Sequence, residues 1–204
     1  MLIIVDYQMG NLGSIHNMLR RIGAKAAVSA QSEHILAADG LILPGVGAFD
    51  QGMKSLQAHG LLPVLEEAVL GRGKPVLGIC LGMQLLTRRS QEGSLPGLGW
   101  IAADCQRFCF GLEQCQLKIP HMGWNATQPA GGHPLFAGLE EAAFYFVHSF
   151  HAVCDDPADV LAYSEHGYRF AAAIGRGRVM GTQFHPEKSH KYGMRLLQNF
   201  VEMI

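Results

Sequence analysis

Short apolar runs alternate along the first half of the chain with longer segments in which apolar residues recur at helical spacing. This alternation is typical of parallel strands joined by helical crossovers. The predicted strands cover 2–6, 26–28, 41–44 and 75–79, and the predicted helices cover 13–23 and 81–89, with an amphipathic stretch that follows Gly47 and runs through Leu70. The first half should therefore be α/β.

The second half has a different pattern. Residues 98–180 are richer in Phe, Tyr and Val, and Gly and Pro clusters separate short runs such as FYFV and FAAAI. These runs predict added strands, some of them antiparallel, followed by a strand at 179–184. Apolar residues at helical spacing predict a closing helix from Ser189 to Met203. No repeat or linker interrupts the chain, so a single domain over residues 1–204 is expected.

Composition narrows the function. Sixteen basic and seventeen acidic residues nearly cancel, so no charge pattern favours a nucleic acid or an anionic membrane as partner. The N-terminus has no basic leader, and no apolar run has the length of a membrane span. The odd number of cysteines and their spacing argue against disulfides and a metal site. These thiols are Cys80, Cys105, Cys109, Cys115 and Cys154. A cytoplasmic protein with reduced thiols is expected.

A candidate nucleophile lies in the segment Gly78-Ile79-Cys80-Leu81-Gly82. A Cys between glycines, after a buried strand and before a helix, is the arrangement of a nucleophile elbow. Small neighbours allow the tight turn, and the helix N-terminus favours the thiolate. The structural alternative is a buried Cys in a tight strand-to-helix turn.

A candidate base follows the last predicted strand, in His185-Pro186-Glu187. Because Pro186 disfavours helical geometry at His185, an extended segment is expected. The His185 imidazole and the Glu187 carboxylate, two residues apart, would then project to the same side. His185 would then accept the thiol proton, and Glu187 would fix its tautomer. A His beside a Pro in a turn is the structural alternative.

Glycines also follow the third predicted strand, in Pro44-Gly45-Val46-Gly47. Ligands of such folds bind at the carboxyl ends of strands, and glycines allow backbone amides to point at a developing negative charge. The segment is therefore a candidate oxyanion hole, with an ordinary loop as the alternative.

Five segments in the same order carry a family resemblance: LPGVGAF, GICLGMQLL, KIPHMGWN, FYFVHSF and GTQFHPEKS. Together they resemble class I glutamine amidotransferases, and most of them resemble the glutaminase subunits of imidazole glycerol phosphate synthase. The resemblance implies a flavodoxin-like open, mostly parallel sheet with helices on both faces and added antiparallel strands. It also implies glutamine hydrolysis without a cofactor.

The resemblance assigns further roles by position. Cys80, His185 and Glu187 would be the catalytic triad, and the oxyanion hole would involve Gly45, Val46 and Leu81. The glutamine-binding residues would be Gln84, Glu92, His148, Ser149 and Phe150, for which helix surface and strand core are the alternatives. The backbone at Val46 would need to be turned by a partner and its ligand before the hole is complete.

A partner is expected because a hydrolase domain of this size leaves no room for an ammonia-accepting site, and released ammonia needs a sheltered route. The resemblance implies a heterodimer with a phosphate-binding β/α barrel synthase (cyclase) subunit. The implied interface residues are Asn11, Met122, Trp124, Asn125 and Lys188. The structural alternatives are a helix cap for Asn11 and core packing for Trp124.

One departure concerns the first loop, where Gln8 replaces the glycine usual in the family, which leaves the shape of the docking loop open. Three other functions are also compatible with the sequence. A paralogous glutaminase could supply ammonia for the amidination of surface sugars. A cysteine hydrolase or protease could use the same fold, and a non-catalytic binding module could retain it.

Overall fold

The computed structural model describes residues 1–111 and 116–204, and Cys115 lies outside the described residues. Five parallel strands form one half of the sheet in the order β2-β1-β3-β4-β12. Their bounds are β1 Leu2–Val5, β2 Ala26–Ser29, β3 Gly40–Gly45, β4 Val76–Cys80 and β12 Val179–Thr182. The carboxyl ends of β3, β4 and β12 therefore meet at one edge, where Gly45 pairs with Cys80.

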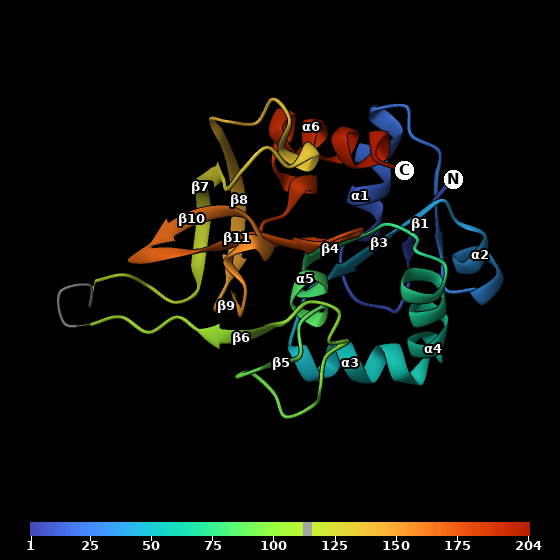
Figure 1. Cartoon of the computed structure of the whole chain (residues 1–204), viewed down its shortest axis with the longest axis horizontal. Helices are drawn as coiled ribbons and strands as arrows, with labels where there is room; N and C mark the ends of the chain where they lie inside the picture. Colours follow the sequence, from blue (N-terminus) through green and yellow to red (C-terminus); the bar gives the residue numbers. More distant parts are fainter. Residues whose placement is uncertain (112–115) are drawn as a thin grey trace.

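Helices cover both faces of this parallel half (Figure 1). Leu2 and Ile4 pack toward α1 (Leu12–Arg21) and α6 (His190–Glu202), whereas Ile3 and Val5 pack toward the other side. The helices on that other side are α2 Ser32–Ala37, α3 Phe49–Ala58, α5 Leu81–Leu85 and α4 Leu61–Glu66, the last of which continues as a π-helical segment, Glu67–Gly71. Strand β1 is apolar throughout because both of its faces are covered.

The other half of the sheet is built mainly from antiparallel pairs and projects to the left in Figure 1. From β12 the order continues through β11 (Tyr168–Arg176), β10 (Val160–His166), β7 (His121–Pro129) and β8 (Ala142–His148). The strands β5 (Arg89–Ser90), β6 (Ala103–Arg107) and β9 (Phe150–Cys154) form a branch that joins β11. Short 3₁₀ turns cover Pro134–Phe136, Pro157–Asp159 and Pro186–Lys188.

The predicted fold class is confirmed, but several boundaries were wrong. The helix predicted at 81–89 is α5, Leu81–Leu85, because the Leu85 carbonyl accepts from the Leu98 amide and Arg89 begins β5, which pairs with β6. The strand predicted at 179–184 ends at Thr182. Helix α2 was not predicted, because Ile35 is its one buried residue and six residues give almost no periodic signal.

Among the described residues, no helix is both long and apolar enough to cross a membrane.

Candidate functional site

The turn at Cys80 has the strained geometry of an elbow. Cys80 has φ 54° and ψ −109°, which side-chain-bearing residues rarely adopt. The positions two residues to either side must be glycine: a Cβ on Gly82 would lie 1.8 Å from the Leu43 carbonyl oxygen, and one on Gly78 would lie 2.6 Å from the Gly82 carbonyl oxygen. The close packing of β3, β4 and α5 therefore fixes the thiol at the start of a helix.

His185 and Glu187 are brought together as the sequence predicted, but by a different backbone. The Nδ1 atom of His185 lies 2.8 Å from Oε1 of Glu187, and both side chains are about 2% exposed. Only His185 is extended, since Pro186–Lys188 form a 3₁₀ turn, and the expectation of a fully extended segment was wrong. Ser189 fixes this turn to β8: its hydroxyl donates to the His185 carbonyl (2.6 Å) and accepts from the Tyr145 amide (3.0 Å).

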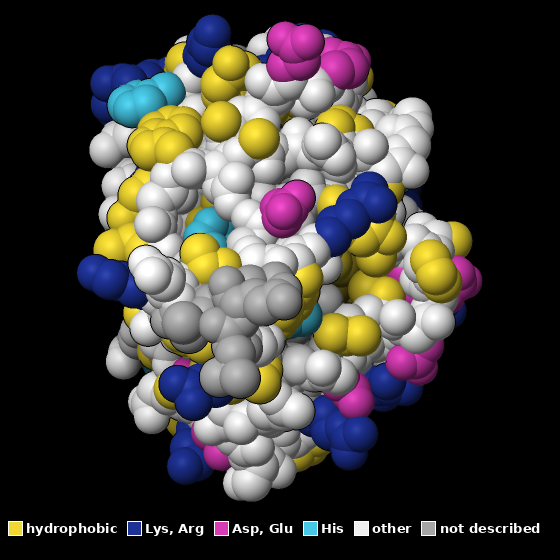
Figure 2. Space-filling view, turned by 90° about the vertical axis from the view of Figure 1, so that its left-hand side faces the viewer, with side chains coloured by type: hydrophobic (Ala, Val, Ile, Leu, Met, Phe, Trp, Pro, Cys, Tyr) yellow, Lys and Arg dark blue, Asp and Glu magenta, His cyan; other side chains and the backbone are white. Residues whose placement is uncertain are grey.

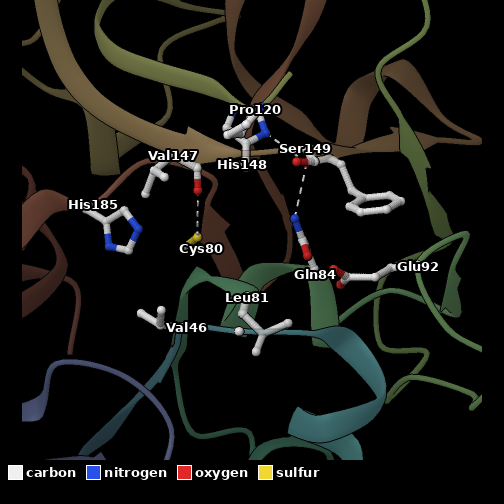
Figure 3. Close-up of a pocket in the computed structure, with 12 residues that line it drawn as sticks. Val46, Cys80, Leu81, Gln84, Glu92, Pro120, Val147, His148, Ser149 and His185 are labelled. Atoms are coloured by element: carbon white, nitrogen blue, oxygen red, sulfur yellow. Dashed lines mark hydrogen bonds between the residues drawn. The ribbon is translucent and has the colours of Figure 1, made fainter. Parts of the chain in front are cut away.

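The environment of His185 favours its charged form. Burial opposes protonation, but the nearby Cys80 and the hydrogen bond with Glu187 outweigh it and raise the pKa of His185 to about 10. Figure 3 shows the imidazole beside Cys80 in the pocket. Among the described residues, none forms a hydrogen bond with its Nε2 atom. This nitrogen is therefore available for proton transfer in the cavity.

The segment after β3 lies against the elbow. A Cβ on Gly45 would lie 2.7 Å from the Tyr7 hydroxyl and 2.8 Å from the Leu81 Cβ, so only glycine fits there. Val46 lines the pocket and is half exposed. Beneath this segment, the buried Tyr7 donates to the Pro44 carbonyl, and burial raises the pKa of its hydroxyl.

These elements surround a cavity of about 300 Å³. Its wall includes Val46, Gly47, Cys80, Leu81, Gln84, Glu92, Pro120, Val147, His148, Ser149, Phe150 and His185. Thus the predicted nucleophile, base and glutamine-binding residues line one cavity. Glu187 is buried behind His185, and Gly45 lies beneath Leu81.

Two of the predicted glutamine-binding side chains are held by defined hydrogen bonds. The amide nitrogen of Gln84 donates to the Phe150 carbonyl (3.2 Å) and to Oε1 of Gln183 (3.1 Å), which leaves its oxygen for the cavity. Oε2 of Glu92 accepts from the Phe49 amide at the start of α3 (2.8 Å). Both residues were also candidates for simple structural roles, and these contacts explain how they are oriented.

Gln183 and Tyr7 were missed as contributors to the site. Gln183 is fully buried, and its amide nitrogen lies 3.8 Å from the sulfur of Cys80. A signal was present in the sequence, because Gln183 is a polar residue in an apolar run, two positions before His185. For Tyr7, no local pattern predicted its contact with Pro44, 37 residues away.

The predicted interface residues show different environments. Met122 and Trp124 are 63% and 49% exposed, so core packing of Trp124 is wrong; its ring instead stacks on His190. Lys188 lies over the Tyr145 ring. On the face viewed in Figure 2, exposed hydrophobic side chains lie beside histidine and basic side chains at the upper left.

The other two predicted interface residues, Asn11 and Asn125, have local hydrogen-bond partners. The side chain of Asn11 caps α1 by accepting from the Ser14 amide (3.2 Å), which is the structural role considered above. The amide of Asn125 contacts Nε2 of His121 (3.1 Å) and donates to the Glu165 carbonyl (2.6 Å). Gln8, which replaces a glycine of the family pattern, has φ 62°, a left-handed conformation that is strained for a residue with a Cβ.

The described cysteines, Cys80, Cys105, Cys109 and Cys154, are all free thiols. Burial raises the pKa values of Cys105 and Cys154 to about 12, so these two thiols are unreactive compared with a nucleophile.

Comparisons with known proteins identify the family of the chain. A model of the family described as glutamine amidotransferase class-I matches residues 3–204. Imidazole glycerol phosphate synthase subunit HisH 2 of Pseudomonas aeruginosa is 51% identical, with 100% of both chains covered. HisH 2 of Methanococcus maripaludis is 46% identical over 99% of both chains. A solved glutamine amidotransferase structure superimposes with a TM-score of 0.74 at 21% identity, covering 98% of this chain and 97% of the other, which supports the fold. The chain therefore belongs to the class-I glutamine amidotransferase family.

Proposed function

We propose that this chain is the glutaminase subunit of an imidazole glycerol phosphate synthase and uses Cys80, His185 and Glu187 as its catalytic triad. The observation that carries the proposal is the strained Cys80 elbow in one cavity with the His185–Glu187 pair. Relatives named HisH over the full length support the pathway. The same length of match supports residues 1–204 acting as one domain.

The chemistry follows from these side chains. The Cys80 thiolate attacks the side-chain amide carbon of glutamine, and the His185 imidazolium gives its proton to the departing nitrogen, so ammonia leaves and a thioester remains. Neutral His185 then removes a proton from water, which attacks the thioester. Glutamate is released and the thiol is restored, while Glu187 keeps His185 in the required tautomer.

The negative charge on the oxygen of the tetrahedral intermediate must be stabilised by hydrogen-bond donors. The amide of Leu81 at the start of α5 and the backbone of Gly45 and Val46 are the proposed source. Gly45 supports this assignment because its close contact with Tyr7 and Leu81 brings the Pro44–Val46 backbone against the elbow. A half-exposed Val46 is accessible to a docked partner that reorients it.

Glutamine recognition is proposed for the opposite wall. The Gln84 oxygen and the Glu92 carboxylate would bind the amino-acid end of glutamine, and the backbone of His148, Ser149 and Phe150 would line its length. A cavity of about 300 Å³ is of a size suited to one amino acid. The free carboxylate oxygen of Glu92 suits the substrate's ammonium group.

The partner is proposed to be a phosphate-binding β/α barrel cyclase that docks over the cavity mouth in a cytoplasmic heterodimer. Exposed Met122 and Trp124 provide apolar anchors, and Asn11 and Lys188 provide polar contacts around them. Asn125, whose amide turns inward to His121 and Glu165, would support this interface strand from its inner face. Large exposed apolar and aromatic side chains beside basic ones are typical of interfaces. Ammonia would pass directly to the cyclase, whose reaction gives the complex its lyase activity.

Glutamate release by the purified chain, alone and mixed with an imidazole glycerol phosphate cyclase and its nucleotide substrate, tests this proposal. Strong stimulation is expected, because a missing oxyanion donor costs about 100-fold or more in rate. Cys80→Ala should abolish turnover while the chain stays folded. Equal rates with and without the cyclase would contradict the proposed coupling.

A second candidate for the subunit that receives the ammonia has one observation in its favour. Two of the relatives are named HisH 2, and the number indicates a further such subunit in their organisms. A paralogous glutaminase feeding surface-sugar amidination would still hydrolyse glutamine through Cys80. It would be stimulated by a different barrel subunit and not by the cyclase, so the same assay separates the two.

A further inference from the structure

Strand β7 presents different side chains on its two faces. Met122 and Trp124 are exposed on the outer face, whereas His121 and Thr127 are buried on the inner face. Asn125 shares the inner face with His121, as residues four apart in a strand do. One strand therefore carries proposed partner contacts on one side and buried polar groups on the other.

These inner groups form a continuous chain of hydrogen bonds to the pocket wall. The Asn125 amide nitrogen lies 3.1 Å from Nε2 of His121, and Nδ1 of His121 lies 3.0 Å from Nε2 of His148. Nδ1 of His148 lies 2.8 Å from the Phe150 carbonyl oxygen. His121 and His148 are direct register partners across β7 and β8.

The donors in this chain can point in only one direction. The Phe150 carbonyl accepts, so Nδ1 of His148 carries the hydrogen and Nε2 of a neutral His148 accepts. His121 must then donate from Nδ1 and accept at Nε2 from the Asn125 amide, which is a donor. Both histidines are thus neutral Nδ1–H tautomers. Burial supports this state, since it lowers the pKa of His121 to about 4 and that of His148 to about 3.

Aromatic packing holds the pair in place. The His121 ring lies 4.3 Å, between centroids, from His166 at an interplanar angle of 25°, and 4.9 Å from Phe146. Phe108 packs against His148 at 5.2 Å. His166 is occupied elsewhere, because its Nε2 contacts the Lys118 carbonyl (3.0 Å). No group of three His, Cys, Asp or Glu among the described residues has metal-binding geometry.

This chain of hydrogen bonds ends at the Phe150 carbonyl oxygen, which also orients Gln84. Figure 3 shows the hydrogen bonds from His148 and Gln84 meeting near Ser149, and both have the Phe150 carbonyl oxygen as acceptor. Gln84 in turn contacts Gln183, which reaches the sulfur of Cys80. A displacement of the Phe150 carbonyl would therefore move both the pocket wall and the Gln84 amide.

We propose that His121 and His148 are positioning residues that link Asn125 on the inner face of β7 to the Phe150 carbonyl and so set the glutamine-binding wall. The inference rests on the proposed glutaminase function. Neither imidazole takes part in proton transfer to substrate, so their effect is on substrate affinity more than on the chemical step.

Kinetics of three variants test the link. His121→Phe removes both hydrogen bonds of His121. It should raise the KM for glutamine about tenfold, since the net free energy of one hydrogen bond corresponds to roughly a tenfold change in affinity. The kcat should change by about threefold or less. His121→Asn retains an amide donor at the position of Nδ1 and should recover most of the KM. His151→Phe is the matched control, because His151 is buried in the same aromatic cluster but bonds to Tyr168, which is not part of the hydrogen-bond chain from Asn125 to Phe150.

An equal KM in His121→Phe and wild type would overturn the proposal, as would an equal rise in His151→Phe. If His121→Phe does not fold, the contrast between His121→Asn and wild type decides: a tenfold higher KM in His121→Asn rejects a role for the donor. Wild-type protein without glutaminase activity would instead reject the proposed function.

Tautomers provide a readout independent of activity. Two-bond ¹H–¹⁵N spectra of the imidazoles should show both His121 and His148 protonated at Nδ1 near neutral pH. A hydrogen at Nε2 on either ring, or a charged imidazolium, would break the inferred direction and sink the proposal even in a protein that hydrolyses glutamine.

Discussion

The Nδ1 atom of His185 lies 2.8 Å from Oε1 of Glu187, and the 3₁₀ turn that carries Glu187 is held against β8 by Ser189. The carboxylate therefore has one fixed acceptor position for the imidazole hydrogen. This geometry makes the contribution of Glu187 measurable.

Glu187→Gln should reduce kcat for glutamine hydrolysis roughly 10²- to 10⁴-fold, because a neutral amide can no longer stabilise the imidazolium and can select the wrong tautomer. Glutamate release in the presence of the activating partner measures the effect. Glu66→Gln, at an exposed helix position, is the matched control and should be unchanged. A loss under threefold would exclude this role for the carboxylate.

The raised pKa of His185 links stability to pH. Its folded-state pKa of about 10 lies above the ordinary 6.5, so its stabilising contribution is complete below about pH 6.5 and is lost as pH rises toward 10. In that window His185 binds more protons in the folded state than in the unfolded state, and the free energy of unfolding should fall by up to about 1.4 kcal/mol per pH unit from this group.

Urea unfolding of wild type and His185→Gln across pH 6.5–10 measures this linkage. The difference in stability between the two proteins should shrink as pH rises. A difference that is constant or grows with pH would mean that the His185 pKa is not raised by its surroundings.

The contact of Gly82 with β3 predicts a large stability effect. A Cβ there would lie 1.8 Å from the Leu43 carbonyl oxygen, which is backbone and cannot move freely. Gly82→Ala should destabilise the protein by about 3 kcal/mol or more. Gly13→Ala is the control: it lies in α1 with nothing near its Cβ position, and should stabilise by about 1 kcal/mol. Thermal or urea unfolding compares them, and similar effects would refute the packing argument.

Gln183 is expected to support the nucleophile. Gln183→Met keeps most of the volume but removes the amide that lies 3.8 Å from the Cys80 sulfur and accepts from Gln84. Alkylation of Cys80 by iodoacetamide and kcat should both fall about tenfold, because a buried thiolate loses one donor. Gln198→Met on the exposed face of α6 serves as control. Unchanged alkylation would show that the amide does not stabilise the thiolate.

A substitution to glycine usually destabilises a protein, but strain at Gln8 predicts that glycine stabilises it there. Gln8 has φ 62°, a left-handed conformation that costs roughly 1 kcal/mol for a residue with a Cβ. Gln8→Gly should therefore stabilise the protein by about that amount, whereas Gln57→Gly in helix α3 should destabilise it by about 1 kcal/mol. Urea midpoints distinguish the two, and a destabilised Gln8→Gly would contradict the strain.

Local sequence was most informative where the physical cause is local. The glycines around Cys80 indicated the elbow because a tight turn needs small residues at fixed offsets, and the apolar runs indicated parallel strands buried on both faces. The His185–Glu187 contact was also predicted, although its 3₁₀ backbone was not, since a two-residue spacing permits more than one turn.

Contacts between distant segments were not visible in the sequence. Helix α5 stops at Leu85 because residues 98–101 and β6 compete for the following backbone groups, and no local residue signals this end. Gln183 reaches Cys80 across 103 positions, and Tyr7 reaches Pro44 across 37. Such pairs depend on strand order, which periodicity does not specify.

By itself, then, the sequence determined the α/β pattern, the elbow at Cys80, and the spacing of His185 and Glu187, because each rests on backbone preferences within a few residues. Tertiary structure alone decided which side chains share the cavity wall, that Trp124 is exposed while Asn125 turns inward, and that His121 meets His148. The physical reason is that strand pairing and register bring together groups whose separation along the chain carries no local energetic signal.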